Sequence, residues 1–426
     1  MAELYRAVWR WHFFAGLLVL PFLLWLAVTV SLYLYKPEIE RAVYGAWMRV
    51  PAAGATLPLD TLSARVAQAT HGAVAQVTKS AAADESWRVT VALHDGERRM
   101  AFVDPHDGRV LGTTSPGGVM QVVRQLHSLA ITGWIGNWMI EIAAGWSIVL
   151  VLSGVWLAWP RGGGKSLTVR GRPRGRLFWR DLHASTGLVA GAVILFLSLS
   201  GLPWSAIWGS NVQAAVAGAG LGRPAAPGAM AHAAHDLPWS LQRAAMPMAG
   251  PPRIGAARAL AAAEARGMAR DWTLTYPAAP GAPYLVSATL GPSEAAHVVY
   301  VDAGSGRVLQ DARFAGFGKA AQVIEWSAAV HQGKEYGEPN RLVMLTACIA
   351  LALLTITAPV MWWKRRPRGR LAAPRAHSGA GLVAIMGVAG LLFPLTGLTM
   401  VAALALQALA RGWRTRRTVP LAPDTA

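Results

Sequence analysis

Four long apolar runs constrain the fold of this chain more than any other feature of its sequence. They cover residues 13–35, 138–159, 188–208 and 342–363, and they contain almost no charged residues. Each run is long enough to cross the roughly 30 Å of hydrocarbon in a bilayer as a helix. The sequence therefore predicts an α-helical membrane protein with four core transmembrane helices.

A fifth apolar run, residues 379–410, is longer than one span needs and is interrupted by Pro394. We expect either a fifth C-terminal transmembrane helix or a re-entrant hairpin bent at the proline. A single span would place the basic tail outside, against the positive-inside rule, and a hairpin removes that conflict. The first run has no small-residue cleavage site after it, so we expect it to remain as an anchor and not to be a signal peptide.

The formal net charge of +18 is concentrated in the segments between the runs. The loops at 161–182 and 365–378 are strongly basic, which predicts that they and the amino terminus are cytoplasmic. The two long intervening segments are then on the other side, and their charges nearly balance. The basic composition therefore reflects membrane topology and gives no indication of nucleic-acid binding.

The two long outer segments resemble each other, which indicates an internal repeat. Each is predicted to contain a helix followed by strands. The first ends with VDPHDGRVL at 103–111 and the second with VDAGSGRVL at 301–309, where a strand enters an Asp and Gly turn and leaves as another strand. We expect two small α+β modules.

The expected organisation follows from these elements. The first repeat consists of a transmembrane helix at 1–36, an outer module at 37–120, and a histidine-bearing turn with the second helix at 121–160, followed by a basic loop at 161–182. The second repeat consists of a third helix at 183–209, an outer module with an Ala, Gly, Pro and Met-rich loop at 210–320, and a histidine-bearing turn with the fourth helix at 321–364. A basic loop at 365–378, the fifth helix or hairpin at 379–410 and a tail at 411–426 complete the chain.

Four histidines recur at matching places. His12 and His183 each begin an H-x-x-x-G-L phrase at the start of a transmembrane helix, and His127 and His331 each precede one on the outer side. A single interfacial histidine is commonly structural. The repeat, however, would bring the first two together at one membrane face and the last two at the other. Paired imidazoles at two depths suit two six-coordinate haem irons.

The type of metal site can be narrowed further. No C-x-x-C-H motif occurs, so each haem would be a b-type haem held by ligation and packing. Zinc is the main rival, but a structural zinc site uses four side-chain ligands and these phrases contain no carboxylate or thiol. His377 opens a third phrase, HSGAGL, and is a possible alternative ligand. His232 and His235, in the Met-rich loop, fit either a copper site or a plain linker.

A glycine follows each of the first two ligand candidates by one helical turn. Gly16 and Gly187 lie on the same helix face as His12 and His183, respectively. They would leave room for a flat macrocycle against the backbone, or serve close helix packing in the membrane.

These residues resemble the PepSY-associated transmembrane family of bacterial iron-regulated inner-membrane proteins, which includes a siderophore reductase. The resemblance implies a multi-pass protein of the bacterial inner membrane, with a cytoplasmic amino terminus and PepSY-like periplasmic modules. It also implies two haem b groups held by His12, His127, His183 and His331. The implied activity is reduction of a ferric siderophore, or another Fe(III) chelate, to Fe(II) in the periplasm for iron uptake, with a quinol or a cytoplasmic reductase as electron donor.

Two other classes of function stay open on sequence alone. The modules could regulate a protease or a sensor partner, with structural histidines, or the chain could transport a metal or haem. Four aromatic residues are weaker candidates for lining the outer haem or the substrate approach, because aromatic residues at a membrane interface are commonly anchors. They are Trp134, Trp138, Trp326 and Tyr336.

Overall fold

A computed structural model describes residues 2–51, 54–160, 167–222, 241, 246–269, 271–288, 291–365 and 380–417. The chain divides into two compact units, each described by itself. The first, which we call the helical unit, comprises Met1–Val28, Ser128–Asn211 and Thr346–Ala426. The second, the sheet unit, comprises Thr29–His127 and Val212–Leu345.

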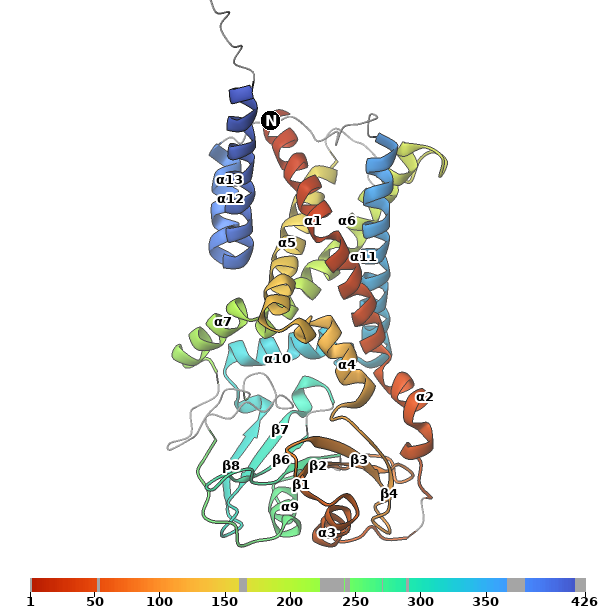
Figure 1. The fold of residues 1–426 in the computed structure, drawn as a ribbon, viewed down its shortest axis with the longest axis vertical. Helices are drawn as coiled ribbons and strands as arrows, with labels where there is room; N and C mark the ends of the chain where they lie inside the picture. Colours follow the sequence, from red (N-terminus) through yellow and green to blue (C-terminus); the bar gives the residue numbers. More distant parts are fainter. Residues whose placement is uncertain are drawn as a thin grey trace, which may run out of the picture. The chain divides into compact units, whose positions relative to one another are not determined.

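The four apolar runs form long helices, which confirms a helical membrane protein (Figure 1). These helices are α1 (Ala2–Leu34), α5 (Trp134–Ala158), α6 (Arg176–Gly201) and α11 (Gly337–Arg365). They are the four helices, among the described residues, that are long and apolar enough to cross a membrane. Helices suit this environment because every backbone hydrogen bond is made within the segment.

The fifth run does not form a single helix. It forms α12 (Ala380–Leu392) and α13 (Pro394–Arg417), which pack against each other (Figure 1). The break falls before Pro394, because proline has no N–H to continue the helix and its fixed φ suits the first turn of a new one. Gly397 and Gly390 approach so closely that a Cβ on Gly397 would lie 2.5 Å from the Gly390 Cα. The run is therefore a helical hairpin, which is one of the two alternatives expected for it.

The hairpin packs on α5 within the helical unit. Trp146 of α5 is buried, and its Nε1 donates a hydrogen bond to Thr399 Oγ1 on α13 at 2.9 Å. The same ring stacks on Trp11 of α1, with 6.2 Å between the ring centroids. Gly145 lies directly against Thr396, so a larger residue there would clash. These contacts hold the hairpin against α5.

The sheet unit contains one antiparallel sheet of eight strands, in the order β4-β3-β2-β1-β5-β6-β7-β8 (Figure 1). The strands are β1 (Gly72–Thr78), β2 (Trp87–Leu93), β3 (Arg98–Val103), β4 (Val110–Thr114), β5 (Thr273–Thr275), β6 (Tyr284–Ala288), β7 (His297–Val301) and β8 (Val308–Arg313). The expected two modules are therefore not separate sheets. Strand β1 pairs with β5, from Gln76 opposite Thr275 to Thr78 opposite Thr273, and this pairing satisfies backbone groups that two isolated edge strands would leave open.

The two Asp and Gly turns have the same geometry. In the first, Gly108 N donates to Asp104 O at 2.9 Å, and in the second Gly306 N donates to Asp302 O at 2.9 Å. Both glycines have positive φ, 75° and 80°, which explains why glycine stands there. The predicted strand, turn and strand order is present in both segments.

Two helices cover one face of the sheet. They are α3 (Leu59–Thr70) and α9 (Ala256–Glu264), and with the strands they form the main core of this unit. Asp60 of α3 accepts a hydrogen bond from Ala256 N at 2.7 Å, and so caps the start of α9. Ser63 Oγ and Tyr276 Oη are 2.6 Å apart. Side chains of the first half therefore hold the second half beyond the β1–β5 pairing.

The opposite face is covered differently in each half. Helix α2 (Lys36–Met48) places Tyr44 and Trp47 against the buried Phe102 of β3. In the second half, Tyr300 of β7 is fully buried in a cluster with Ala321 of α10 (Lys319–His331). Burying each such aromatic side chain contributes roughly 2–3 kcal/mol. The sequence analysis did not foresee α2 or β1, because α2 is rich in charge and β1 lacks a clear alternation of apolar and polar residues.

Candidate functional site

Two of the four repeated histidines lie in the helical unit, each near the start of a long helix. His12 Nδ1, on α1, is 2.9 Å from Ser153 Oγ on α5. His183 Nδ1, on α6, is 2.8 Å from Thr357 Oγ1 on α11. Ser153 and Thr357 open two similar phrases, SGVWLAWPR and TAPVMWWKR. Histidines at matching positions of the sequence therefore contact hydroxyls at matching positions.

The hydroxyl groups determine which ring nitrogen carries the proton. Ser153 Oγ donates to Leu150 O at 3.2 Å, and Thr357 Oγ1 donates to Leu354 O at 3.2 Å. A hydroxyl has one proton to donate, so each oxygen accepts its second hydrogen bond from the imidazole. Both histidines then carry the proton on Nδ1 and keep a lone pair on Nε2. A metal-ligating histidine has this arrangement, with one nitrogen held by a neighbour and the other directed to the metal.

Glycines make room around these rings. A Cβ on Gly154, next to Ser153, would lie only 3.1 Å from Cε1 of His12. Gly16 and Gly187, one turn after the histidines, each face a leucine on the neighbouring helix, at 3.9 and 3.8 Å from an added Cβ. An added Cβ at Gly16 or Gly187 would thus make only ordinary contact with its leucine, whereas Gly154 leaves the space that the imidazole uses.

The structure places His12 within electrostatic range of His183. The two rings are close enough for the charge on one to affect the other, and both side chains are half-buried. Pairing of these residues at one end of the helices was the prediction that most depended on the repeat.

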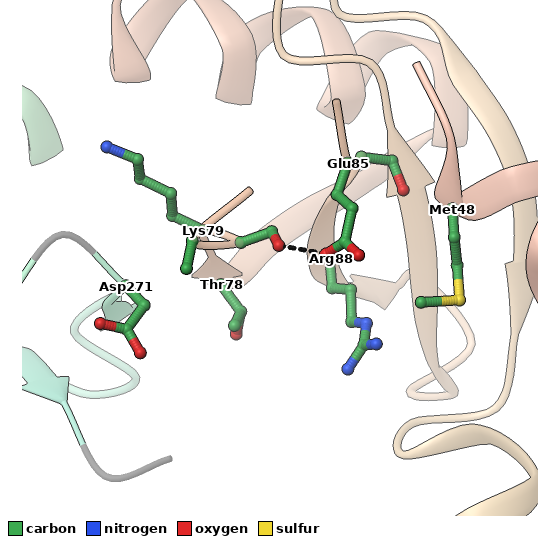
Figure 2. A pocket seen from close by; sticks show the side chains of 9 residues that line it. Met48, Thr78, Lys79, Glu85, Arg88 and Asp271 are labelled. Atoms are coloured by element: carbon green, nitrogen blue, oxygen red, sulfur yellow. Dashed lines mark hydrogen bonds between the residues drawn. The ribbon is translucent and has the colours of Figure 1, made fainter. Parts of the chain in front are cut away.

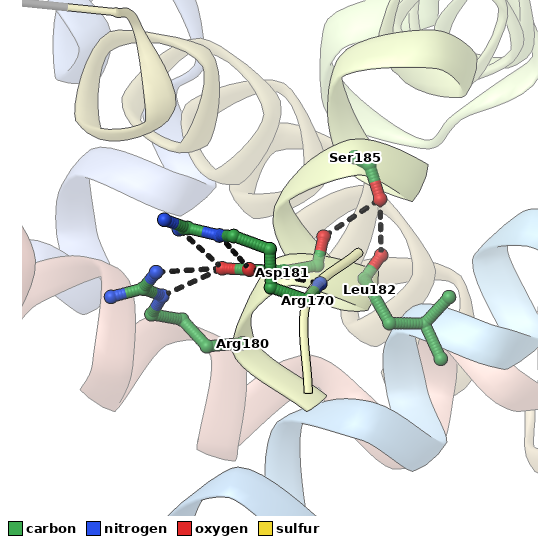
Figure 3. Close-up of polar contacts among 5 residues, drawn as sticks. All are labelled: Arg170, Arg180, Asp181, Leu182 and Ser185. Atoms are coloured by element: carbon green, nitrogen blue, oxygen red, sulfur yellow. Dashed lines mark hydrogen bonds and ion pairs between the residues drawn. The ribbon is translucent and has the colours of Figure 1, made fainter. Parts of the chain in front are cut away.

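A buried acid fixes the start of α6, two residues before His183. Asp181 is 6% exposed and forms ion pairs with Arg170 at 2.8 Å and Arg180 at 2.7 Å (Figure 3). The Ser185 hydroxyl donates to the backbone oxygen of Asp181 at 2.7 Å. Removing either arginine would leave buried charge less well compensated, so this network holds the first turns of α6 in place. It thereby positions His183.

The other two histidines lie in the sheet unit, each as the last residue of a short helix. His127 ends α4 (Gly118–His127) and His331 ends α10. The turns that lead into the next long helices begin after these histidines. His127 Nδ1 is 3.0 Å from Thr29 Oγ1, so a third histidine pairs its Nδ1 with a hydroxyl.

Both of these imidazoles are neutral at pH 7. Burial lowers the pKa of His127 from 6.5 to about 4. Burial, and then the nearby His127, lower the pKa of His331 to about 3. The influence of His127 on His331 means that these two rings lie within electrostatic range of each other. Neutral imidazole is the form that ligates a metal.

The aromatic candidates form two local pairs. Trp134 and Trp138 contact each other edge to face at 4.7 Å in the helical unit, and Trp134 is largely exposed. In the sheet unit, Trp326 Nε1 donates to Tyr336 Oη at 2.9 Å. Neither observation distinguishes an anchor from a lining residue.

Three histidines named in the sequence analysis lie outside the described residues. They are His377, which opens the third phrase, and His232 and His235 of the Met-rich loop. The His12 and His183 pairing therefore stands on described residues alone.

Two features were missed by the sequence analysis. Glu141, the one acid in the second apolar run, is 3% exposed and accepts hydrogen bonds from the N–H groups of Ile207 and Trp208 at 2.8 and 3.1 Å. It caps the start of α7 (Ile207–Gly218). An acid inside an apolar run is a signal that sequence reasoning could have used.

The second missed feature is a small polar pocket of about 180 Å³ in the sheet unit, beside the junction of β1 and β5 (Figure 2). Ser86, which lines it, is buried, and its Oγ has no hydrogen-bond partner among the described residues. The volume is below the roughly 300 Å³ at which ligand sites begin, so the pocket suits only a small polar group. The lining residues are Met48, Thr78, Lys79, Ser80, Ala81, Glu85, Ser86, Arg88 and Asp271.

The donor set at the histidine pairs suits haem better than a bare metal ion. The residues described include no group of three or more His, Cys, Asp or Glu side chains that could hold a metal ion. A six-coordinate haem iron takes four ligands from the porphyrin and needs only two from the protein. The neutral imidazoles of His127 and His331, and the Nε2 lone pairs of His12 and His183, fit that requirement.

Fold and site together define a helical membrane protein with an attached sheet domain and paired histidines. The family can now be stated. The model of the PepSY-associated TM region matches residues 9–365, and the chain belongs to this family. The match ends where α11 ends, so the hairpin of α12 and α13 lies beyond it. Comparison with curated proteins finds no match.

Proposed function

We propose that this protein is a diheme electron-transfer protein of the bacterial inner membrane that reduces a ferric siderophore, or another Fe(III) chelate, to Fe(II) in the periplasm for iron uptake. The observation that carries the proposal is the double pairing of histidines. His12 lies within electrostatic range of His183 in the helical unit, and His331 lies within electrostatic range of His127 in the sheet unit. At three of the four rings, Nδ1 is paired with a hydroxyl.

The four histidines would hold two haem b groups, one at each pair. Haem bound there supplies a one-electron Fe(III)/Fe(II) couple. The protein would orient the ligands through Ser153, Thr357 and Thr29, and the backbone contacts of Ser153 and Thr357 favour the proton on Nδ1 of His12 and His183. Outer-sphere electron transfer needs no acid or base, and we assign none.

The charge distribution and the duplication support the direction of transfer. The basic loop between α5 and α6 and the basic segment after α11 favour a cytoplasmic location for His12 and His183. The sheet unit, a duplicated pair of PepSY-like modules on this proposal, is then periplasmic with His127 and His331. Each Fe(III) chelate takes one electron, so a quinol donor would serve two chelates and release two protons.

The test is a visible absorption spectrum of the full chain purified from haem-replete cells. We expect about two haems per chain by pyridine extraction. Sharp bands of low-spin haem should appear on reduction with dithionite. Adding a ferric chelate without oxygen should return the oxidised spectrum and release Fe(II) to a ferrous-specific dye.

A colourless preparation overturns the proposal and favours a regulatory protein with structural histidines. A reduced haem protein that no Fe(III) chelate reoxidises keeps the diheme assignment and overturns the substrate. Vesicles that accumulate metal or haem without any redox change would favour the transporter.

A further inference from the structure

The turn after His331 places a lysine in an unusual position. Helix α10 ends at His331, Gly333 reverses the chain with φ 72°, and the backbone N–H of Lys334 donates to Ala329 O at 2.9 Å. The turn is thus folded back on the last turn of the helix that carries His331. Asn340 secures it further, because its Nδ2 donates to Val330 O at 2.9 Å. Lys334 is therefore fixed close to a candidate ligand of the second histidine pair.

The acids closest in sequence to Lys334 already have partners. Glu335 accepts hydrogen bonds from Ser293 N at 2.8 Å and Ser293 Oγ at 2.9 Å. Glu338 forms an ion pair with Arg341 at 2.9 Å. Among the described residues, neither carboxylate forms an ion pair with Lys334.

The acids of α2 are likewise committed. Glu38 pairs with Arg341 at 2.6 Å, and Glu40 pairs with Arg88 at 3.0 Å and Lys36 at 3.7 Å. Among the residues that the structure describes, the ammonium group of Lys334 has no carboxylate partner and no hydrogen-bond acceptor.

The surroundings of Lys334 disfavour an unpaired charge. The side chain is half-buried, and burial, followed by repulsion from Lys36, lowers its pKa from 10.5 to about 8. A half-buried cation without a partner is costly, whereas a neighbouring anion would offset that cost. A charge-assisted hydrogen bond from the Lys334 ammonium group to an anion is stronger than a neutral one and would offset this cost.

We propose that Lys334 binds a carboxylate, and that this carboxylate is a propionate of the haem at the His127 and His331 pair. The inference rests on the proposed function. The corresponding position of the first half, three residues after His127, is Ala130, so the turn of the second half alone supplies a cation. A b-type haem has no covalent link to the chain, and a charge-assisted bond to a propionate orients it in the site.

The experiment compares Lys334→Met with wild type and with two further variants. Lys334→Arg keeps the charge, and Lys319→Met removes an exposed lysine from the far end of α10 as a matched control. Each full-length apoprotein is reconstituted in nanodiscs with haem b and, separately, with haem dimethyl ester, whose propionates carry no charge. The measurements are the affinity for each haem and its midpoint potential.

With haem b, Lys334→Met should lower the affinity of one of the two haem sites about tenfold, because one charge-assisted hydrogen bond is lost. It should also lower that haem's potential, because a nearby cation stabilises the reduced state. Lys334→Arg and Lys319→Met should behave as wild type. With the ester, wild type and Lys334→Met should be alike.

Three results overturn the inference. One is equal affinity and potential in Lys334→Met and wild type with haem b. Another is a wild-type protein that binds the ester as tightly as haem b; this comparison uses no variant and so does not depend on a variant folding. The third is an effect of Lys334→Met that appears only with phosphatidylglycerol and vanishes in phosphatidylcholine, which would assign a lipid headgroup. A wild type that binds no haem overturns the proposed function instead.

Discussion

The repeated histidines of the two halves have matching surroundings in the helical unit but different surroundings in the sheet unit. Beside α5 and α11, His12 and His183 make the same contact with a hydroxyl that donates to a backbone oxygen three residues earlier. After α4 and α10, by contrast, the first half has Ala130 where the second has the unpaired Lys334. Matching contacts thus orient His12 and His183, whereas the surroundings of His127 and His331 differ between the two halves.

The largest expected effect comes from removing a ligand. His12→Ala and His331→Ala should each reduce the haem content from about two per chain to about one, because a bis-histidine iron loses half of its protein ligands. Pyridine extraction and the reduced spectrum measure this. His94→Ala, at an exposed site, is the control and should keep both haems. If His12→Ala and His331→Ala removed the same spectral component, the two histidines would not ligate different haems, and the assignment of one haem to each histidine pair would be wrong.

The next effect concerns pH and the apoprotein. The folded-state pKa values of His127 and His331, about 4 and about 3, lie below the unfolded value of 6.5. The unfolded state therefore binds more protons between pH 6.5 and 4, and the free energy of unfolding should fall as pH falls through that window, by on the order of 2 kcal/mol per ring. Thermal unfolding of apoprotein in detergent at several pH values measures this.

Two variants separate this effect from general acid unfolding. The double substitution His127→Asn and His331→Asn should flatten the dependence between pH 6.5 and 4. Haem should also flatten it, because iron holds the imidazoles unprotonated. An unchanged pH slope in the double variant would show that other groups cause it.

A smaller effect is expected from the hydroxyls in the helical unit. Ser153→Ala and Thr357→Val should each lower the affinity for the haem at the His12 and His183 pair about tenfold. This is the lower end of the effect usually seen when a metal-ligating histidine loses its hydrogen-bond partner. Ser153→Thr keeps a hydroxyl and should retain affinity. Haem titration of the apoprotein measures the change. Unequal effects of the two removals would break the equivalence between the halves.

The smallest expected effect is on the cohesion of the halves within the sheet. Asp60→Ala removes the cap that α3 provides to α9 and should lower the free energy of unfolding by about 1 kcal/mol. Asp60→Asn keeps a hydrogen-bond acceptor and should lower the free energy of unfolding by a smaller amount. Urea unfolding followed by tryptophan fluorescence can measure both, since Trp87 and Trp272 contact each other across the joined halves. No change in Asp60→Ala would show that the β1–β5 pairing and the other contacts between the halves hold them without this cap.

Local sequence predicted what local chemistry determines. Long apolar runs form helices because hydrocarbon leaves backbone groups no partner outside the helix, so α1, α5, α6 and α11 were readable directly. The VDPHDGRVL and VDAGSGRVL phrases predicted two turns because glycine tolerates positive φ. The family resemblance came from these elements together with the spacing of the histidines, and the match over residues 9–365 confirms it.

Tertiary structure alone decided which partners those residues meet. Nothing in the phrase around Ser153 or Thr357 shows that a histidine more than a hundred residues away reaches the hydroxyl, because helix packing sets that contact. The merging of two modules into one sheet depends on β1 meeting β5. The unpaired state of Lys334 emerges only when each nearby acid is found with another partner. A sequence fixes local backbone preference and burial pattern, but contacts between distant residues follow from how all the elements pack at once.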